Sequence, residues 1–279
     1  MILIAESGST STDWRIIHGN GRVDELRTVG INPSQRTEEE VFTEISTNVK
    51  PNITATIEQV YYYGTGVATE ELVALMVSVL RKIFTEAKVV EAYSDLLASA
   101  RAICGKQAGI ACILGTGSNS CLYDGQKIID NVPAGGYVLG DEGSGSAMGR
   151  KLLNAFLKRG LPEDIHSKLQ EEYSLTMAEI IQQVYRQGHN SRYLASFTRF
   201  MNEHIANSAV RGIVAASLGE FFDNNVLKYA DYKKYPVGFV GSIAHHFLPI
   251  LKEEAEKREI TIGRIIQAPI DELVAYHKS

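Results

Sequence analysis

The chain has 279 residues, a length near which single cores divide, so we expect two domains. Its net charge of -5, with 22% charged residues, provides no basic field for a polyphosphate backbone and argues against nucleic acid as a partner. The three cysteines form no CxxC pair, so they suggest neither a disulfide framework nor a zinc site. The sequence has no basic leader and no apolar run near ~18 residues, which favours a cytoplasmic protein without a membrane partner.

The first hundred residues predict an α/β domain that begins with a β-meander. Apolar runs predict five strands, with a hairpin turn at Gly19–Gly21 between the second and the third: Ile2–Ala5, Asp13–His18, Arg22–Val29, Gln59–Tyr63 and Lys88–Glu91. Serine or threonine caps predict three helices: Thr37–Val49, Thr69–Phe84 and Ser94–Cys104. Gly105 is a natural cap for the last helix, so the boundary falls near residues 105–108 and divides the chain into domains 1–106 and 107–279.

The second half repeats this plan and then becomes helical. Three meander strands are expected, with an Asp124–Gly125 turn between the last two: Ile110–Leu114, Asn119–Tyr123 and Lys127–Asp130. Helical spacing of apolar residues predicts five helices: Ser144–Leu157, Thr176–Arg186, Ser191–Ala206, Ser208–Tyr229 and Ile243–Lys257. A strand at Val237–Val240 precedes the last of these, and the segments Ile260–Ile262 and Asp271–Tyr276 close the chain.

Two strand-then-loop segments end in runs of small hydroxyl residues. Met1–Trp14 reads MILIAESGSTSTDW, and Gly109–Cys121 reads GIACILGTGSNSC. In each, a buried strand leads into Gly, Ser and Thr residues, whose amides and hydroxyls suit a phosphate group. Either segment alone is equally an ordinary hairpin turn. The pair, about a hundred residues apart, predicts two similar half-molecules that face each other across a nucleotide.

Three carboxylates stand where they could act on a ligand. Glu6 ends the first strand, so it could bind Mg²⁺ directly or through water, and the alternative is a surface residue. Asp95 lies at the carboxyl end of a strand and begins a helix, so it is either a helix cap or a base that takes a proton from an attacking hydroxyl. Asp141, in the glycine-dense segment Gly135–Ser144, is either a helix cap or, with Glu142, an acceptor for sugar hydroxyls.

These motifs, in their order, resemble a known family. ESGSTSTDW, GINP, SDLLASA, GTGSNS, GGYVLGDEGS and VGS are similar to segments of the N-acetylglucosamine kinase and benzoyl-CoA-reductase-activator ATPase branch of the superfamily of sugar kinases, heat-shock ATPases and actin. GTGSNS and GDEGS are its most specific parts, whereas GINP and VGS alone are typical of turns. The resemblance implies an α/β fold of two duplicated ribonuclease H-like (actin-like ATPase) domains with a central cleft. It further implies five-stranded mixed sheets, a second domain enlarged by helices, and a last helix that packs back on the first domain.

The resemblance implies an ATP-dependent kinase that phosphorylates an amino sugar, above all N-acetylglucosamine at its 6-hydroxyl, with ATP and Mg²⁺ as cofactors. Asp95 matches the catalytic base, and Glu6 would bind Mg²⁺ directly or through water. The residues that match phosphate-binding positions are Ser7, Gly8, Ser9, Thr10, Ser11, Thr12, Gly115, Thr116, Gly117 and Ser118. The residues that match adenosine-binding positions are Gly241 and Ser242. The residues that match sugar-binding positions are Asn32, Asp95, Thr116, Gly135, Gly136 and Asp141.

Departures from the family pattern keep alternatives open. Glu6 stands where the family has aspartate, Ser11 where it has lysine, and Asp271–Glu272 where it often has a Gly-Ala pair. A non-catalytic sugar or nucleotide sensor is one alternative, which the change at Glu6 favours and the retention of Asp95 opposes. A BadF-type activator ATPase is another, which the cysteines oppose because all three fall inside predicted helices or strands. The acceptor sugar and the oligomeric state both stay open; if a homodimer forms, its expected contact surface is the helical region Thr176–Tyr229.

Overall fold

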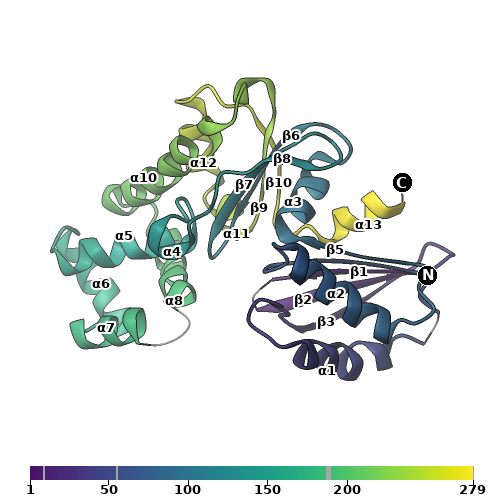
Figure 1. Cartoon of the computed structure of the whole chain (residues 1–279). Helices are drawn as coiled ribbons and strands as arrows, with labels where there is room; N and C mark the ends of the chain where they lie inside the picture. Colours follow the sequence, from purple (N-terminus) through teal and green to yellow (C-terminus); the bar gives the residue numbers. More distant parts are fainter. Residues whose placement is uncertain (9, 55, 187–189, 279) are drawn as a thin grey trace. The chain divides into compact units, whose positions relative to one another are not determined.

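The computed structural model describes residues 1–8, 10–54, 56–186 and 190–278 (Figure 1). The chain forms two compact units. Unit 1 comprises Met1–Lys106 together with Ala268–Ser279, and unit 2 comprises Gln107–Gln267. The chain therefore passes from one unit to the other twice, and its last segment belongs to unit 1.

Unit 1 is built on a five-stranded mixed sheet with the order β3-β2-β1-β4-β5. Its strands are β1 (Ile2–Ser7), β2 (Ser11–Ile17), β3 (Val23–Val29), β4 (Gln59–Gly64) and β5 (Val89–Ser94). β2 is antiparallel to both β1 and β3, whereas β4 is parallel to both β1 and β5. The carboxyl ends of β1, β3, β4 and β5 therefore meet at one edge of the sheet, where open α/β sheets bind their ligands.

Helices cover both faces of this sheet (Figure 1). They are α1 (Glu38–Asn48), α2 (Glu70–Ile83), α3 (Asp95–Cys104) and α13 (Ile270–Lys278). α1 and α2 pack over Leu3 and Trp14, and α3 and α13 pack over Ile4 and Tyr63 on the other face. Successive residues of β1 thus enter two different cores, which explains why β1 is a continuous apolar run.

Unit 2 repeats this topology. Its strands are β6 (Gly109–Leu114), β7 (Ser118–Tyr123), β8 (Ile128–Asp130), β9 (Val237–Val240) and β10 (Ile262–Ile266). The sheet order is β10-β9-β6-β7-β8, with β6-β7-β8 antiparallel and β6-β9-β10 parallel. Read from the meander, β8-β7-β6-β9-β10 is the same arrangement as β3-β2-β1-β4-β5. The predicted duplication of an α/β domain on two five-stranded mixed sheets is therefore confirmed.

Unit 2 carries a long helical region that unit 1 lacks. Its helices are α4 (Gly136–Leu139), α5 (Gly145–Leu157), α6 (Glu163–Tyr173), α7 (Met177–Tyr185), α8 (Asn190–Ser196), α9 (Thr198–Glu203), α10 (Ser208–Asn224), α11 (Ser242–His246) and α12 (Leu248–Glu256). Phe200, Phe221 and Phe239 join the sheet and these helices in one continuous core.

Four sequence predictions for unit 2 need correction. The helix expected at 191–206 is two helices, which divide close to where the Leu194 carbonyl packs against Gly149 of α5. The helix expected at 243–257 is also two, because Pro249 has no N–H to continue the first. The strand expected at 260–262 is β10, which begins where that range ends, and the helix expected at 208–229 ends at Asn224.

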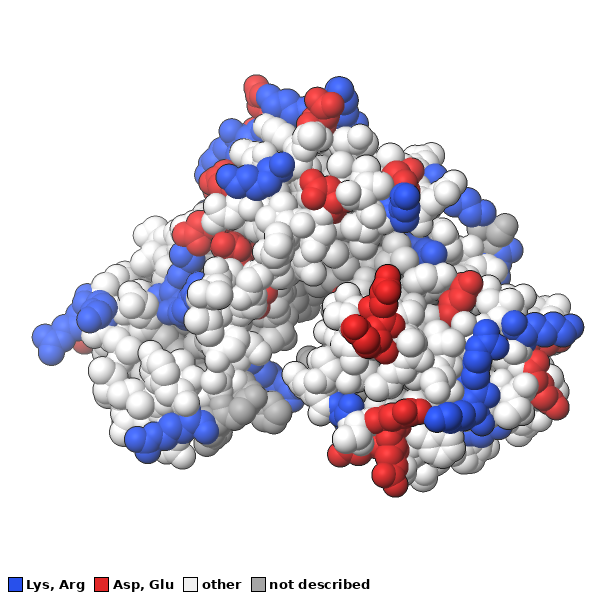
Figure 2. All heavy atoms as spheres, in the orientation of Figure 1, with Lys and Arg blue, Asp and Glu red and all other residues white. Residues whose placement is uncertain are grey.

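Charges of both signs are interspersed over the face drawn in Figure 2, with neither sign gathered into one extended field. None of the described helices has the length and apolar character needed to span a membrane.

Candidate functional site

The edge of the unit 1 sheet at the carboxyl end of β1 carries three carboxylates, those of Glu6, Asp13 and Asp95. Glu6 at the end of β1 lies opposite Asp13 of β2 in the antiparallel register. Burial raises the pKa of Glu6 to about 7, with further contributions from the negative charges of Asp95 and Asp13, while Arg27 opposes the shift. Because the negative charges of Asp95 and Asp13 disfavour the ionised form of Glu6, a bound cation or proton at Glu6 would stabilise this edge.

Asp95 lies at the junction of β5 and α3. Ser94 caps the helix with its hydroxyl, which accepts from the Leu97 N–H at 3.2 Å. Burial raises the pKa of Asp95 above its ordinary value, while the Leu96 N–H and the Thr65 hydroxyl oppose the shift. Asp95 is thus a half-buried carboxylate with an increased affinity for a proton.

Thr65 was not singled out from the sequence. It lies in the loop after β4, where its N–H donates to the Ser7 carbonyl at 2.9 Å. A signal was present, because Gly64–Gly66 reads GTG, the same three residues that open GTGSNS at Gly115. The Gly-Thr-Gly turn therefore occurs at the carboxyl end of a central strand in both units.

Buried side chains stabilise the first hydroxyl-rich hairpin. The side chains of Ser7 and Thr12 are fully buried, and their hydroxyl oxygens lie 2.7 Å apart. Ser7 Oγ also bonds to both backbone groups of Ile31, at 2.9 and 3.0 Å. Ser7 and Thr12 thus connect the hairpin to β3 and its following loop, so their side chains are already occupied.

The rest of this hairpin can present backbone groups and two hydroxyls. The Gly8 N–H donates to the Ser11 carbonyl at 3.0 Å, and Ser11 Oγ accepts a bond from Arg27 at 2.8 Å. Thr10 is exposed. Ser9, also predicted to bind phosphate, lies outside the described residues.

Asn32 lies in the loop after β3. Its Oδ1 accepts from the N–H and hydroxyl of Ser34 at 3.0 and 2.7 Å. Gly66 packs so closely that a Cβ atom there would lie 2.0 Å from Asn32 Oδ1. Because Gly66 follows Thr65, whose hydroxyl contributes to the pKa of Asp95, Asn32 and Asp95 both lie close to this short loop.

The second hydroxyl-rich hairpin is fixed by a helix in unit 2. The Gly115 N–H closes the turn by donating to the Gly117 carbonyl at 3.0 Å. The N–H groups of Gly145 and Ser146, in the first turn of α5, donate to the carbonyls of Gly115 and Thr116 at 2.9 and 3.0 Å. The turn is therefore rigid, and the exposed Thr116 side chain is free to meet a ligand.

Asp141 lies beneath this hairpin. Its Oδ1 accepts from the Ser118 N–H at 3.2 Å, and a Cβ on Gly117 would lie 3.0 Å from its other carboxylate oxygen. Burial raises its pKa, Glu142 adds to the shift, and the Ser118 N–H opposes it. Asp141 has the left-handed φ of 54°, a strained conformation common at functional sites.

Gly135 and Gly136 shape the turn that leads to Asp141. Both have positive φ, 74° and 69°, which favours glycine. The Ala134 carbonyl just before them accepts from the Asp141 N–H at 2.9 Å. These predicted sugar-contact residues therefore belong to one local structure.

Gly241 lies directly against the second hairpin. Its φ is 124°, and a Cβ there would be 2.2 Å from the Leu114 carbonyl oxygen. Ser242, the next residue, is exposed and begins α11. The structure thus brings the VGS segment and the GTGS hairpin together at the carboxyl ends of β6 and β9.

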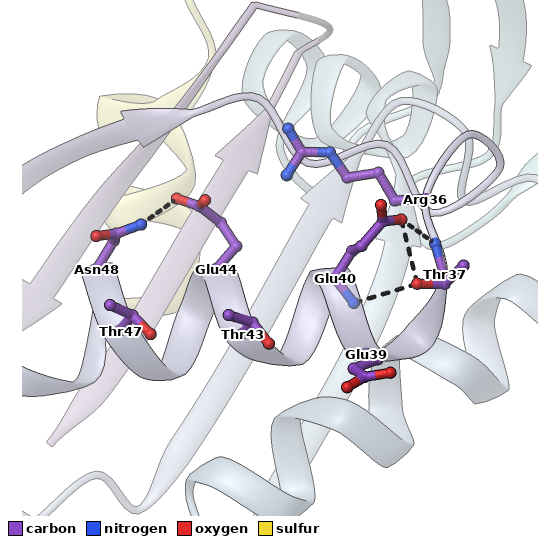
Figure 3. Close-up of a pocket in the computed structure, with 8 residues that line it drawn as sticks. All are labelled: Arg36, Thr37, Glu39, Glu40, Thr43, Glu44, Thr47 and Asn48. Carbon is purple, nitrogen blue, oxygen red and sulfur yellow. Dashed lines mark hydrogen bonds between the residues drawn. The ribbon is translucent and has the colours of Figure 1, made fainter.

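A separate hollow of about 760 Å³ lies along α1 (Figure 3). Its lining is polar, and the dashed lines in Figure 3 show the capping box of Thr37 and Glu40 and the bond between Glu44 and Asn48. These bonds belong to the helix itself, and none of the predicted site residues lines this hollow.

The carboxylate edge of unit 1 fits a magnesium ion by its chemistry. Mg²⁺ takes one or two carboxylates together with waters and phosphate oxygens. Glu6 has a largely buried carboxylate that could act as a metal ligand, and a cation would stabilise its ionised form. Over the part of the chain that the structure describes, no cluster of three or more His, Cys, Asp or Glu could hold a metal by itself. Glu6 would therefore share its ion with water and a phosphate-bearing ligand.

Comparison with known proteins identifies close structural relatives. No model of a known protein family matches the sequence, and no curated protein matches it. The "Putative N-acetylglucosamine Kinase" of Porphyromonas gingivalis is 40% identical, with a TM-score of 0.94 over 99% of this chain and 98% of that one.

Two more distant structures share the fold. The "Putative N-acetylglucosamine Kinase" of Chromobacterium violaceum is 13% identical, with a TM-score of 0.76 over 99% of this chain and 98% of that one. A non-polymerising mutant of MamK bound to AMPPNP is 12% identical, with a TM-score of 0.60 over 97% of this chain and 95% of that one. With the 40% identical relative matched over its whole length, the chain has the actin-like ATPase fold and belongs to the N-acetylglucosamine kinase family, as its motifs predicted.

Proposed function

We propose that the chain is an ATP-dependent kinase that phosphorylates an amino sugar, with N-acetylglucosamine as acceptor and its 6-hydroxyl as the reacting group. The observation that carries this proposal is Asp95, a half-buried carboxylate at the carboxyl end of a parallel strand, whose pKa burial raises. Kinship with a 40% identical sugar kinase relative supports the choice of substrate class.

Asp95 would act as the general base. It accepts the proton of the sugar hydroxyl while that oxygen forms a bond to the γ-phosphorus and the bond from this phosphorus to the β-phosphate oxygen breaks, giving the sugar phosphate and ADP. The raised pKa increases its proton affinity, and the start of α3 directly after β5 fixes where the carboxylate lies.

The two hairpins would bind phosphate groups. In unit 1 the donors that we propose are the hydroxyls of Thr10 and Ser11, together with backbone N–H groups of the same turn. In unit 2 they are the Thr116 hydroxyl and the N–H groups of Thr116 and Gly117, in a turn that α5 holds in a fixed conformation. A rigid set of donors stabilises charge that develops during transfer without reorganising.

The remaining predicted residues would select the two ligands. Gly241 and Ser242 would lie next to the adenosine, where a side chain at Gly241 has no room. The sugar would contact Asn32, Thr116, Gly135, Gly136 and Asp141. Mg²⁺ at Glu6, when bound, neutralises phosphate charge. We propose the cytoplasm as the place of this reaction, in line with the sequence analysis.

The test is an ATP-dependent phosphorylation assay with a panel of amino sugars and Mg²⁺. We expect turnover with N-acetylglucosamine and a loss of kcat of about 10²- to 10⁴-fold in Asp95→Asn, because the amide keeps a hydrogen-bonding oxygen but cannot take the proton. Ser94→Ala is the matched control, because it removes the helix cap beside Asp95 and leaves the carboxylate.

Three results would contradict the proposal. Sugar binding without turnover in the wild type would indicate a sensor. ATP hydrolysis without any sugar requirement would indicate an activator ATPase. Equal kcat values for the wild type and Asp95→Asn would remove Asp95 from the reaction.

A further inference from the structure

A hydrogen-bonded network joins α3 and α13 to the centre of the unit 1 sheet. Tyr63 of β4 accepts a bond from Arg101 Nη1 of α3 at 2.6 Å, and its Oη lies 2.8 Å from His277 Nε2 of α13. We call these three residues the Tyr63 network. None of them belongs to the motifs that carried the sequence predictions.

The protons of the Tyr63 network can be assigned. Arg101 only donates, so the single phenolic proton of Tyr63 remains for His277 Nε2, which places the imidazole's own proton on Nδ1. Burial and the positive charge of Arg101 lower the pKa of His277 to about 4. A neutral His277 that accepts from Tyr63 satisfies both constraints.

Aromatic rings surround the Arg101 guanidinium. Its central carbon lies 4.3 Å from the ring centroid of Tyr93 and 5.1 Å from that of Tyr276. Its Nε is buried without a hydrogen-bond partner, so the Tyr63 hydroxyl and the rings fix the side chain. The ring of Tyr61 stacks on that of His277, with 3.8 Å between the ring centroids.

The Tyr63 network lies beside the carboxylate edge. Tyr63 pairs in register with Glu6 of β1, so their side chains are neighbours on one face of the sheet. Arg101 and Asp95 belong to the same helix, α3, six residues apart, and Ala98 between them packs in the core below α13. A displacement of Arg101 would therefore move the rigid helix that carries Asp95.

From this arrangement we infer that Tyr63, Arg101 and His277 are positioning residues for Asp95, so that the C-terminal helix α13 sets the orientation of the base through α3. The inference rests on the proposed function for its effect on turnover. Its structural part, the fixing of α3 by the Tyr63 hydroxyl, stands independently of the reaction.

The experiment compares Tyr63→Phe with Tyr61→Phe. Both keep an aromatic ring on β4, but only the first removes the hydroxyl shared by Arg101 and His277, since the Tyr61 hydroxyl donates to Gln59. For Tyr63→Phe we expect kcat to fall about 10- to 100-fold with KM for ATP and sugar within about twofold, and faster amide hydrogen exchange at Leu96 and Leu97. For Tyr61→Phe we expect none of these changes.

Substitution of His277 supplies a rescue test. His277→Gln offers an amide oxygen near the position of Nε2 and should retain most of kcat, whereas His277→Leu should lose it as Tyr63→Phe does. Wild-type kcat in Tyr63→Phe, or equal losses in the two His277 variants, would overturn the inference. A wild type without kinase activity would contradict the proposed function instead, and unchanged amide exchange in Tyr63→Phe would then overturn the inference by itself.

Discussion

Units 1 and 2 have the same strand order but place different chemistry at the same edge of the sheet. In unit 1 this edge gathers the carboxylates of Glu6, Asp13 and Asp95. In unit 2 it gathers the glycine turn at Gly115 and the close contact with Gly241. The comparison teaches that the fold supplies a position and the loops supply the reaction.

Helices that begin near the two edges contribute differently. In unit 1, α3 follows β5 directly, carries Asp95 at its start and bonds its Leu97 N–H to the Ser94 hydroxyl. In unit 2, the N–H groups of Gly145 and Ser146 in α5 bond to the carbonyls of the hairpin. A helix N-terminus therefore carries a carboxylate in one unit and fixes a turn in the other.

The largest expected effect tests the close contact of Gly241 in unit 2. Gly241→Ala would put a Cβ 2.2 Å from the Leu114 oxygen at a φ of 124°, so we expect the free energy of unfolding to fall by more than about 3 kcal/mol. Gly212→Ala is the control, because Gly212 lies in α10 and a Cβ added there would have nothing within 4 Å. Its free energy of unfolding should rise by about 0.5–1 kcal/mol. Urea unfolding measures both, and a stable Gly241→Ala variant would contradict the contact.

Much of the fold followed from local signals. The meander strands of both units, the hairpin turns and the capped helices α1, α2 and α5 all lie within two residues of their expected limits. Helix α6 was missed because only Ile165 and Leu169 are buried in it, which leaves a weak apolar period. Long-range packing, such as the Leu194 carbonyl on Gly149, has no signature in a single sequence.

For the candidate site, the sequence indicated which strand ends carry the polar residues, but not which contacts their side chains make. Asp95 and Gly241 stand out by position and residue type. The inward orientation of the Ser7 and Thr12 hydroxyls could not be foreseen, because it depends on Ile31 and on which face of the sheet each residue occupies. Sequence shows which residues can donate, but tertiary structure decides which donors are already used.

The pH dependence of stability tests the buried carboxylate of Glu6, which distinguishes the edge of unit 1 from that of unit 2. The pKa of Glu6 rises from 4.5 to about 7 on folding. The contribution of Glu6 to the free energy of unfolding is therefore fully present below pH 4.5 and is lost as the pH rises through 7. Glu6→Gln should therefore match the wild type near pH 4 and be more stable by up to about 3 kcal/mol at pH 8. Glu25→Gln, on the same face but 70% exposed, is the control. An equal difference at both pH values would contradict the burial of Glu6.

The smallest expected effect concerns the serine caps of the two edge helices. Ser94 accepts from Leu97 N–H and Ser144 from Ala147 N–H, each at 3.2 Å, but only Ser144 is fully buried and also bonded to Ser146, at 3.0 Å. Ser94→Ala should cost about 0.5–1 kcal/mol and Ser144→Ala about 2 kcal/mol, because the second also leaves a buried hydroxyl without its partner. Urea unfolding of the two variants gives the difference. Equal losses would mean that the helix termini at the two edges are equivalent, and that only the side chains beyond them distinguish unit 1, with its carboxylates, from unit 2, with its close glycine contacts.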